Sequence, residues 1–244
     1  MELERSSGAL LHPTSLPSPY GIGDIGPAAH GWIDFLADTG TQYWQALPLG
    51  PTGYGNSPYQ CHSSFAGNPY LISPKSLFQA GLLSENDLED PPVFLEETID
   101  YGTVIPWKVD LLDRAYMKFE TGYFPHLEKD LELFRKQEAG WLEDFALFMA
   151  IKEFHREKSW VKWPPPLRDR DLEALETFKG KHPAAIKKQK FRQFLFYRQW
   201  ENLRGYAQKQ GVKIIGDLPI FVAHDSADVW VNRDLFYLDE DGHP

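Results

Sequence analysis

The sequence has little cysteine, little positive charge and no long apolar run. Its 244 residues include one cysteine, Cys61, which cannot form an internal disulfide and is typical of a reducing cytoplasm. No apolar run is long enough to span a membrane, and the first residues lack the basic and apolar segments of a signal peptide. Lysine and arginine number 25 against 35 acidic residues, a net charge of −10. We therefore expect a cytoplasmic chain that binds neither nucleic acid nor membrane.

Charge is also scarce in the first third of the chain, where glycine and proline are concentrated. Between residues 6 and 74 the charged residues are Asp24, Asp34 and Asp38. The chain up to Leu83 holds 11 of the 19 glycines and 9 of the 19 prolines. Such a segment is typical of shaped loops packed on a scaffold, where binding residues tend to lie.

Three short apolar stretches predict buried strands at residues 9–12, 43–47 and 212–217. The third stretch is rich in β-branched residues, which is typical of a parallel strand buried on both faces. Between the first two, the spacing of apolar residues predicts a helix over residues 27–39. Strand, helix and strand in this order predict an α/β fold with a parallel sheet.

The second and third predicted strands are separated by too many residues for a single crossover helix. Apolar residues recur at helical spacing in residues 147–154 and 196–207, on either side of a proline-rich break at residues 163–166. We therefore expect an inserted, mainly helical subdomain. The predicted division is 1–75 for the first two strand–helix units and a binding loop, 76–210 for the insertion, and 211–244 for the third strand.

Several short patterns resemble functional motifs and are better explained otherwise. Residues 21–26 match G-x-G-x-x-G, but no acidic residue follows at the expected distance, so a plain glycine-rich loop is favoured over a dinucleotide site. His224, Asp225 and Ser226 spell a triad only in sequence, and Cys61-His62 lacks further metal ligands. The basic run at residues 187–190 is interpreted as a solvated helix face.

Asp217 is more informative because it ends the third predicted strand. Ligands of α/β folds bind at the carboxyl ends of the strands, so Asp217 is a candidate binding residue. A helix cap or a structural hydrogen-bond acceptor explains the same position equally well. Asp225 and Asp228 are predicted to cap the following helix, with Ser226 competing for that role.

A loop rich in tyrosine, at residues 53–60, is the other candidate binding element. Tyr54 and Tyr59 could stack on the apolar face of a sugar while polar neighbours bind its hydroxyls. Simple packing of these rings, and of Tyr70, is favoured by the spacing alone. A glycosidase needs two carboxylates, and Asp217 is the only good candidate at a predicted strand end.

Four segments carry a resemblance to a known family. Residues 11–23 (LHPTSLPSPYGIG), 43–60 (YWQALPLGPTGYGNSPYQ), 65–72 (FAGNPYLI) and 216–230 (GDLPIFVAHDSADVW) resemble, in the same order, the amylomaltases, which are bacterial 4-α-glucanotransferases. The resemblance implies a partial (β/α)8 TIM barrel, here strands one to three, with the helical insertion. It also implies transfer of α-1,4-glucan segments, such as maltooligosaccharides, to acceptor sugars by a retaining mechanism that needs no metal or organic cofactor.

The resemblance also assigns roles to individual residues. Tyr59 and Asp217 match substrate-contacting residues, and Ser57 and Pro58 belong to the same loop as Tyr59. Tyr54 matches a residue of a secondary glucan-binding site, whose usual aromatic companion is replaced near Ile105.

Family members are longer than this chain, and their catalytic carboxylates lie on later strands. The nucleophilic Asp belongs to an Arg-Ile-Asp-His-type motif that does not occur here, and the acid/base Glu is expected beyond Pro244. We therefore expect the isolated chain to be inactive, with the missing C-terminal half as a potential partner. The alternatives are a glucan-binding module without catalysis, one half of a split enzyme and, more remotely, a nicotinamide dehydrogenase.

Overall fold

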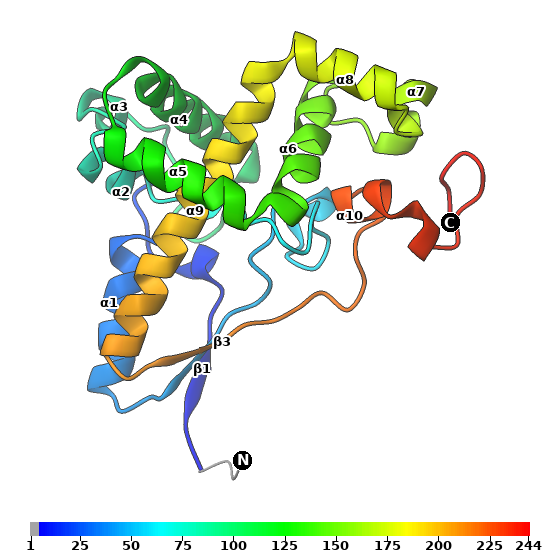
Figure 1. Ribbon diagram of the computed structural model, residues 1–244. Coiled ribbons are helices and arrows are strands. Elements are labelled where there is room, and N and C mark those ends of the chain that lie inside the picture. The colour runs from blue at the N-terminus through cyan, green and yellow to red at the C-terminus, as the bar shows by residue number, and fades with distance from the viewer. Residues whose placement is uncertain (1–4) are drawn as a thin grey trace. The chain divides into compact units, whose positions relative to one another are not determined.

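The computed structural model describes residues 5–244, which form two compact units (Figure 1). Unit 1 comprises residues 5–49, 68–124 and 195–218, and unit 2 comprises residues 50–67, 125–194 and 219–244. The division predicted from the sequence, at residues 75 and 210, stays a prediction.

Unit 1 is an α/β unit built on a parallel sheet. Its elements are β1 (Gly8–Leu10), α1 (Pro27–Asp38), β2 (Tyr43–Gln45), α2 (Pro74–Gln79), α3 (Asn86–Glu89), α4 (Tyr101–Thr121) and β3 (Lys213–Ile215). The strands pair in the order β1-β2-β3, and all pairs are parallel. The α/β class predicted from the sequence is confirmed, with a parallel sheet of three strands among the described residues.

The predicted first helix is confirmed as α1, and its ends have clear local causes. Pro27 occupies the first helical turn, where a missing N–H costs nothing. Gly40 ends the helix in the left-handed conformation, at φ 69°, and the next N–H, that of Thr41, donates to the carbonyl of Leu36 at 2.8 Å. The C-terminal part of α9 (Pro183–Lys209) lies beside α1, where the Tyr206 hydroxyl donates to Asp34 (Figure 1).

The sheet is buried on one face only. Trp44 of β2 is fully buried, and its indole N–H donates to the carbonyl of Leu11 at 2.8 Å. Leu10 and Ile215 are 60% and 44% exposed. The prediction that the third strand is buried on both faces is therefore wrong, because Lys213 and Ile215 of β3 are exposed and Ile214 is only half-buried.

Unit 2 is mainly helical. Its elements are α5 (Pro125–Gln137), α6 (Ala139–Phe154), α7 (Pro165–Arg168), α8 (Leu172–Lys181), the first part of α9 and α10 (Ala227–Val231). Its core is aromatic: the ring of Phe148 lies 5.3 Å from that of Trp163 and 5.8 Å from that of Trp230. The helical character predicted between the second and third strands is confirmed, and the proline-rich break falls between α6 and α8.

A buried ion pair lies in the core of unit 1. The side chain of Lys108 in α4 is 1% exposed, and its ammonium donates to the carbonyl of Ile72 at 2.9 Å. The carboxylate of Asp24 lies 3.8 Å away. Burial lowers the pKa of Lys108 to about 8, although the charge of Asp24 acts in the opposite direction.

The lowered pKa of Lys108 predicts that the free energy of unfolding depends on pH. Because the ordinary lysine pKa of 10.5 falls to about 8 in the folded chain, the unfolded chain binds more protons between these values. The contribution of Lys108 to stability is therefore lowest below pH 8 and rises with pH. Relative to Lys108→Met, the wild-type free energy of unfolding should gain about 2–3 kcal/mol between about pH 7.5 and pH 10.

Urea unfolding at both pH values measures this gain, with Lys75→Met as a control because Lys75 is exposed. A difference between wild type and Lys108→Met that does not change with pH would contradict the expected titration.

Candidate functional site

The tyrosine-containing loop of unit 2 is a short, closed hairpin. Thr52 and Cys61 form an antiparallel bridge at its base, and the N–H of Gly53 donates to the carbonyl of Gln60 at 2.8 Å. Gly55 and Asn56 turn the chain with φ of 70° and 54°. Both values lie in the left-handed region, which glycine and asparagine adopt more readily than other residues.

The predicted binding residues of this loop lie together in sequence and differ in exposure. Tyr59 is 45% exposed, which leaves its ring accessible to a ligand. The N–H of Tyr59 donates to the hydroxyl of Ser57 at 3.3 Å, so this serine shapes the turn that presents the ring. Ser57 and Pro58 are half-buried. The backbone of Tyr54 begins a 3-10 turn, Tyr54–Asn56, but its side chain lies outside the described part of the structure.

The end of the loop is fixed to the start of α10. The ring Nδ1 of buried His62 donates to the carbonyl of Asp225 at 2.9 Å, and the N–H of Ala227 donates to the carbonyl of His62 at 2.8 Å. The N–H of Ser64 donates to the carboxylate of Asp228 at 2.9 Å. Burial lowers the pKa of His62 and raises that of Asp228. The loop therefore has a rigid base.

The capping prediction for α10 needs correction. Ser226 is the N-cap, and its hydroxyl accepts from the N–H of Val229 at 3.2 Å. Asp225 instead accepts from the ammonium of Lys152 at 2.6 Å and from the N–H of Trp160 at 3.2 Å. Asp228 accepts from Ser64. Tertiary partners therefore compete successfully with the local cap.

The interpretation of the triad-like run as a coincidence is supported by the geometry. The ring Nε2 of His224 lies 2.7 Å from the carbonyl of Gly242, Asp225 pairs with Lys152, and Ser226 caps α10. Each side chain has a separate partner, so no proton relay connects them.

The basic run at residues 187–190 is not simply a solvated face, so that prediction is partly wrong. Gln189 and Lys190 are 5% and 7% exposed. Lys190 is paired with Glu143 of α6, and Gln189 donates to Glu153 of α6 at 3.0 Å. The packing of α6 against α9 covers them.

The space around the glycine-rich run of unit 1, residues 21–26, is occupied by other parts of the chain. The N–H of Gly26, at the start of α1, donates to the carboxylate of Asp24 at 2.9 Å. A Cβ at Gly23 would lie 2.1 Å from the carbonyl oxygen of Pro13. A carboxylate already occupies the helix N-terminus where the pyrophosphate of a dinucleotide would bind. This supports the interpretation of the run as a plain glycine-rich loop and not as a dinucleotide site.

Asp217 lies in unit 1, two residues after the end of β3. No helix begins there among the described residues, because the next one, α10, is capped by Ser226. The interpretation of Asp217 as a helix cap is therefore wrong. Two of the predicted roles remain for this side chain: contact with a ligand, or acceptance of a structural hydrogen bond. The side chain is half-buried, whereas the next residue, Leu218, is 77% exposed. Asp217 belongs to unit 1, whereas Tyr59 belongs to unit 2.

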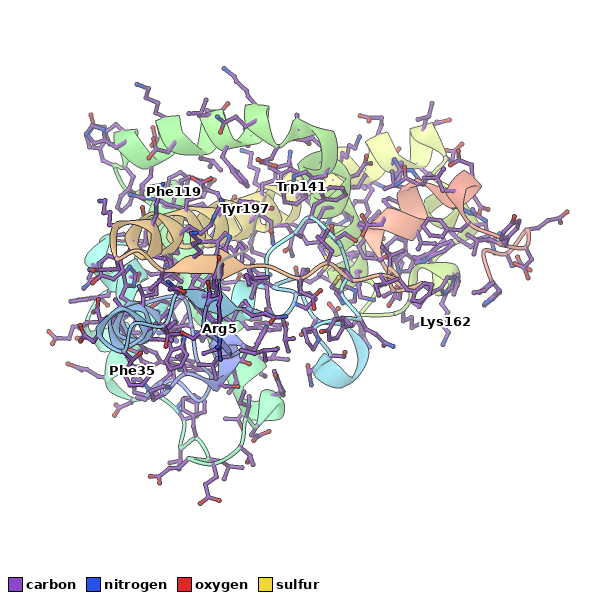
Figure 2. The ribbon with its side chains drawn as sticks, turned by 90° about the horizontal axis from the view of Figure 1, so that it is seen from below. Arg5, Phe35, Phe119, Trp141, Lys162 and Tyr197 are labelled. Atoms are coloured by element: carbon purple, nitrogen blue, oxygen red, sulfur yellow. The ribbon has the colours of Figure 1, made fainter. Side chains whose placement is uncertain are left out.

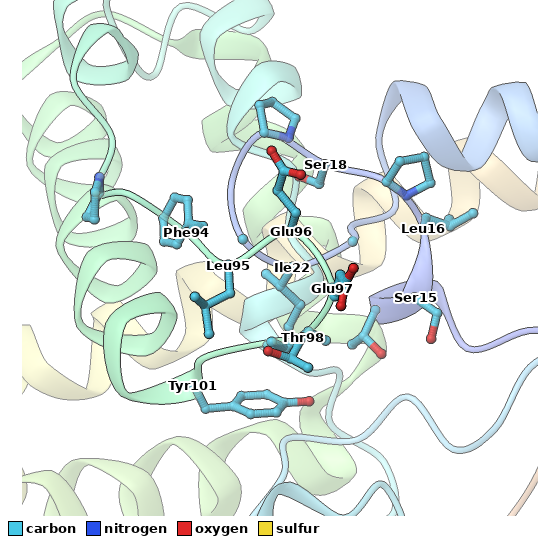
Figure 3. Close-up of a pocket in the computed structure, with 17 residues that line it drawn as sticks. Ser15, Leu16, Ser18, Ile22, Phe94, Leu95, Glu96, Glu97, Thr98 and Tyr101 are labelled. Atoms are coloured by element: carbon cyan, nitrogen blue, oxygen red, sulfur yellow. The ribbon is translucent and has the colours of Figure 1, made fainter.

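A cavity of about 920 Å³ in unit 1 was not predicted from the sequence (Figure 3). The loop after β1 contributes Ser15 and Ser18, residues 92–99 contribute Glu96 and Glu97, and Tyr101 begins α4. Burial raises the pKa of Tyr101, so its phenol stays neutral. Hydroxyl and carboxylate groups beside an aromatic ring are suited to polyhydroxylated ligands. Residues 92–99 match no motif, so only their folding against the first loop reveals the cavity.

Two further observations concern metals and membranes. Residues 5–244 contain no cluster of three or more His, Cys, Asp or Glu side chains that could hold a metal ion. In the same part of the chain, none of the helices combines the length and the apolar character that crossing a membrane requires.

Comparisons with known proteins agree on one family. A family model described as 4-alpha-glucanotransferase matches residues 11–243. The 4-alpha-glucanotransferase of Thermus thermophilus is 48% identical over 100% of this chain and 48% of its own length. That of Synechocystis is 46% identical over 97% of this chain and 47% of its own length.

A solved structure agrees with these sequence matches. The amylomaltase from Streptococcus agalactiae in complex with acarbose superposes with a TM-score of 0.94 at 39% identity, over 99% of this chain and 48% of that one. The chain thus spans about half the length of the relatives that it matches.

Proposed function

Because the chain belongs to the 4-alpha-glucanotransferase family, we propose that it forms half of the catalytic domain of an enzyme that transfers segments of α-1,4-glucans between sugars. The observation that carries the proposal is the match of residues 11–243 to that family. In this proposal β1, β2 and β3 are the first three strands of a (β/α)8 barrel, and the helices between β2 and β3 form its inserted subdomain. Ligands of such barrels bind at the carboxyl ends of the strands.

The substrate is a maltooligosaccharide or a longer α-1,4-glucan. Tyr59, presented by the turn at Ser57 and Pro58, stacks on the apolar face of a glucosyl ring. Asp217 accepts hydrogen bonds from sugar hydroxyls at the end of β3.

Transfer with retention needs two carboxylates about 5 Å apart, one as nucleophile and one as acid/base. The nucleophile attacks the anomeric carbon and forms a covalent glycosyl-enzyme while the acid protonates the departing oxygen. The oxygen of the acceptor 4-hydroxyl then attacks the same carbon, which releases the nucleophile, and the hydroxyl gives its proton to the acid/base residue. Residues that directly follow β1 and β2 are uncharged, and Asp217 alone follows β3 closely. We therefore propose that both catalytic carboxylates are on strands outside these 244 residues and that no metal or organic cofactor takes part.

A chimera tests the proposal directly. Residues 1–244 are joined to the part of the Thermus thermophilus relative that follows its matched segment, and glucose release from maltotriose is measured. We expect glucose and longer maltooligosaccharides from the chimera and no glucose from the 244-residue chain alone. Replacing Tyr59 by Ala in the chimera should lower kcat/KM about 10-fold, because one aromatic stacking contact with the sugar is lost.

Each outcome discriminates between the candidate functions. An inactive chimera with native-like circular dichroism would count against the transferase proposal. Turnover by the 244-residue chain alone would show that it contains its own catalytic carboxylates. Binding of maltooligosaccharides by the chain, with no transfer by the chimera, would favour a glucan-binding module.

A further inference from the structure

An exposed aromatic pair in unit 2 is not used by the proposed site. Phe65 is 58% exposed, and its ring is stacked on that of Trp141 with the centroids 6.3 Å apart and an interplanar angle of 18°. Trp141 lies at the start of α6 (Figure 2). Its indole N–H donates to Glu138 at 2.6 Å, so the ring is held in place behind Phe65.

The backbone that carries Phe65 is fixed on both sides of the residue. The N–H groups of Phe65 and Ala66 donate to the hydroxyl of buried Ser63 at 3.1 and 3.3 Å. The N–H of Ser64 donates to Asp228. Because the turn is closed by these bonds, the phenyl ring is presented to solvent at little cost in conformational entropy.

A small cavity of about 90 Å³ adjoins the ring pair. Its polar lining consists of Ser63, Asp144, Asp228 and Asn232. Asp144 is 40% exposed and is oriented by an ion pair with Arg170 at 2.7 Å. The side-chain N–H of Asn232 donates to the carbonyl of Asp228 at 3.0 Å, which leaves its amide oxygen to accept from a ligand. The cavity is therefore rich in hydrogen-bond acceptors.

From this arrangement we infer that Phe65 and the adjacent cavity form a surface subsite for an α-1,4-glucan chain, separate from the Tyr59 loop. The inference rests on the proposed function for the identity of its ligand. A glucosyl ring stacks on Phe65 by its C–H face, and the hydroxyls at one edge enter the cavity and donate to Asp144 and Asn232. The cavity has room for about three water-sized groups, so it takes hydroxyls and not the ring itself.

The subsite chemistry favours a neutral polyol over a protein partner. The apolar area of one ring pair is far below that of a stable protein interface. Sugar hydroxyls are donors that match these acceptors without a charge of their own.

The chain offers a matched control for the aromatic pair. Phe35 of α1 is 55% exposed and is stacked on Trp32 with the centroids 5.5 Å apart and an interplanar angle of 21° (Figure 2). Replacing Phe35 removes a ring of similar exposure and similar stacking from unit 1. Any effect that depends only on loss of an exposed phenyl ring appears in both variants.

The test is a titration of the 244-residue chain with maltoheptaose, followed by calorimetry and by the NMR signal of the Trp141 indole N–H, assigned with Trp141→Phe. We expect saturable binding that shifts this signal. Phe65→Ala should weaken binding about 3- to 10-fold at this subsite, whereas Phe65→Tyr and Phe35→Ala should bind as the wild type does.

Thermal unfolding of each variant shows whether it is folded. Unchanged maltoheptaose affinity in folded Phe65→Ala, or an unmoved Trp141 signal, would overturn the subsite even if the chimera transfers glucans. Equal weakening by Phe35→Ala would also overturn it. An inactive chimera with a Phe65-dependent binding signal would instead remove the transferase proposal and leave the subsite.

Discussion

Replacing Asp217 by Asn in the chimera is expected to lower kcat/KM for maltotriose about 10- to 100-fold. The substitution keeps the size of the side chain and removes the negative charge that strengthens hydrogen bonds from sugar hydroxyls. Hydrogen bonds to a charged group contribute about 1.5–3 kcal/mol, which converts to this range of rates. Initial rates of glucose release over a range of maltotriose concentrations separate an effect on KM from one on kcat.

Asp38→Asn is the matched control for Asp217, because Asp38 is an exposed aspartate at the end of α1 in the same unit. It should leave kcat/KM within about twofold of the unsubstituted chimera, as surface substitutions rarely exceed about 0.5 kcal/mol. If Asp217→Asn also stays within that range, Asp217 is a structural acceptor and not a substrate contact.

Replacing Lys152 by Met is expected to destabilise unit 2 by about 3 kcal/mol, the usual cost of removing one partner from a buried ion pair. The Lys152 side chain is 3% exposed and that of Asp225 is 33% exposed, so the expected loss is at the lower end for buried pairs. The ammonium also donates to the carbonyl of Glu157 at 3.2 Å. Methionine fills the space of the lysine stem but removes the ammonium from both acceptors, and Asp225 keeps only the N–H of Trp160.

Urea unfolding followed by tryptophan fluorescence measures this loss. Lys179→Met is the control, because its partner Glu176 and Lys179 itself are 72% and 46% exposed, and such surface pairs contribute little. The double variant Lys152→Met with Asp225→Asn should recover part of the stability, since the uncompensated charge is gone. A loss below about 0.5 kcal/mol in Lys152→Met would show that the pair is not effectively buried.

Lys152 also matters for the candidate site. Its partner Asp225 supplies the carbonyl that accepts from His62, at the base of the Tyr59 loop. A change in Lys152 is therefore expected to loosen the loop as well as the helices around it. Hydrogen exchange of residues 53–60 in the same variant reports this second effect.

The secondary structure that positions the site could be predicted from local patterns. The three strands and α1 were predicted because apolar periodicity, Pro27 and Gly40 act within a few residues of one another. Asp217 was predicted as a binding residue because a carboxylate at a strand end is visible in sequence, and this role stays a prediction. Tyr59 was selected from its loop, and its ring proves accessible.

The partners of charged side chains could not be predicted in the same way. Lys190 looked solvated but is covered by α6, and Asp225 looked like a cap but pairs with Lys152, 73 residues away. The Phe65 ring and the cavity residues Asp144 and Asn232 are spread over three segments of the chain. No local spacing connects such residues.

The sequence by itself determined the class of fold and the family, because these depend on short-range periodicity and on long collinear motifs. It also predicted which residues contact a sugar, from the same motifs. Only the tertiary structure decided which polar groups are buried, which residue caps α10, and where aromatic rings meet acceptors. The physical reason is that a buried charge or an exposed ring is defined by neighbours distant in sequence, and packing alone selects those neighbours.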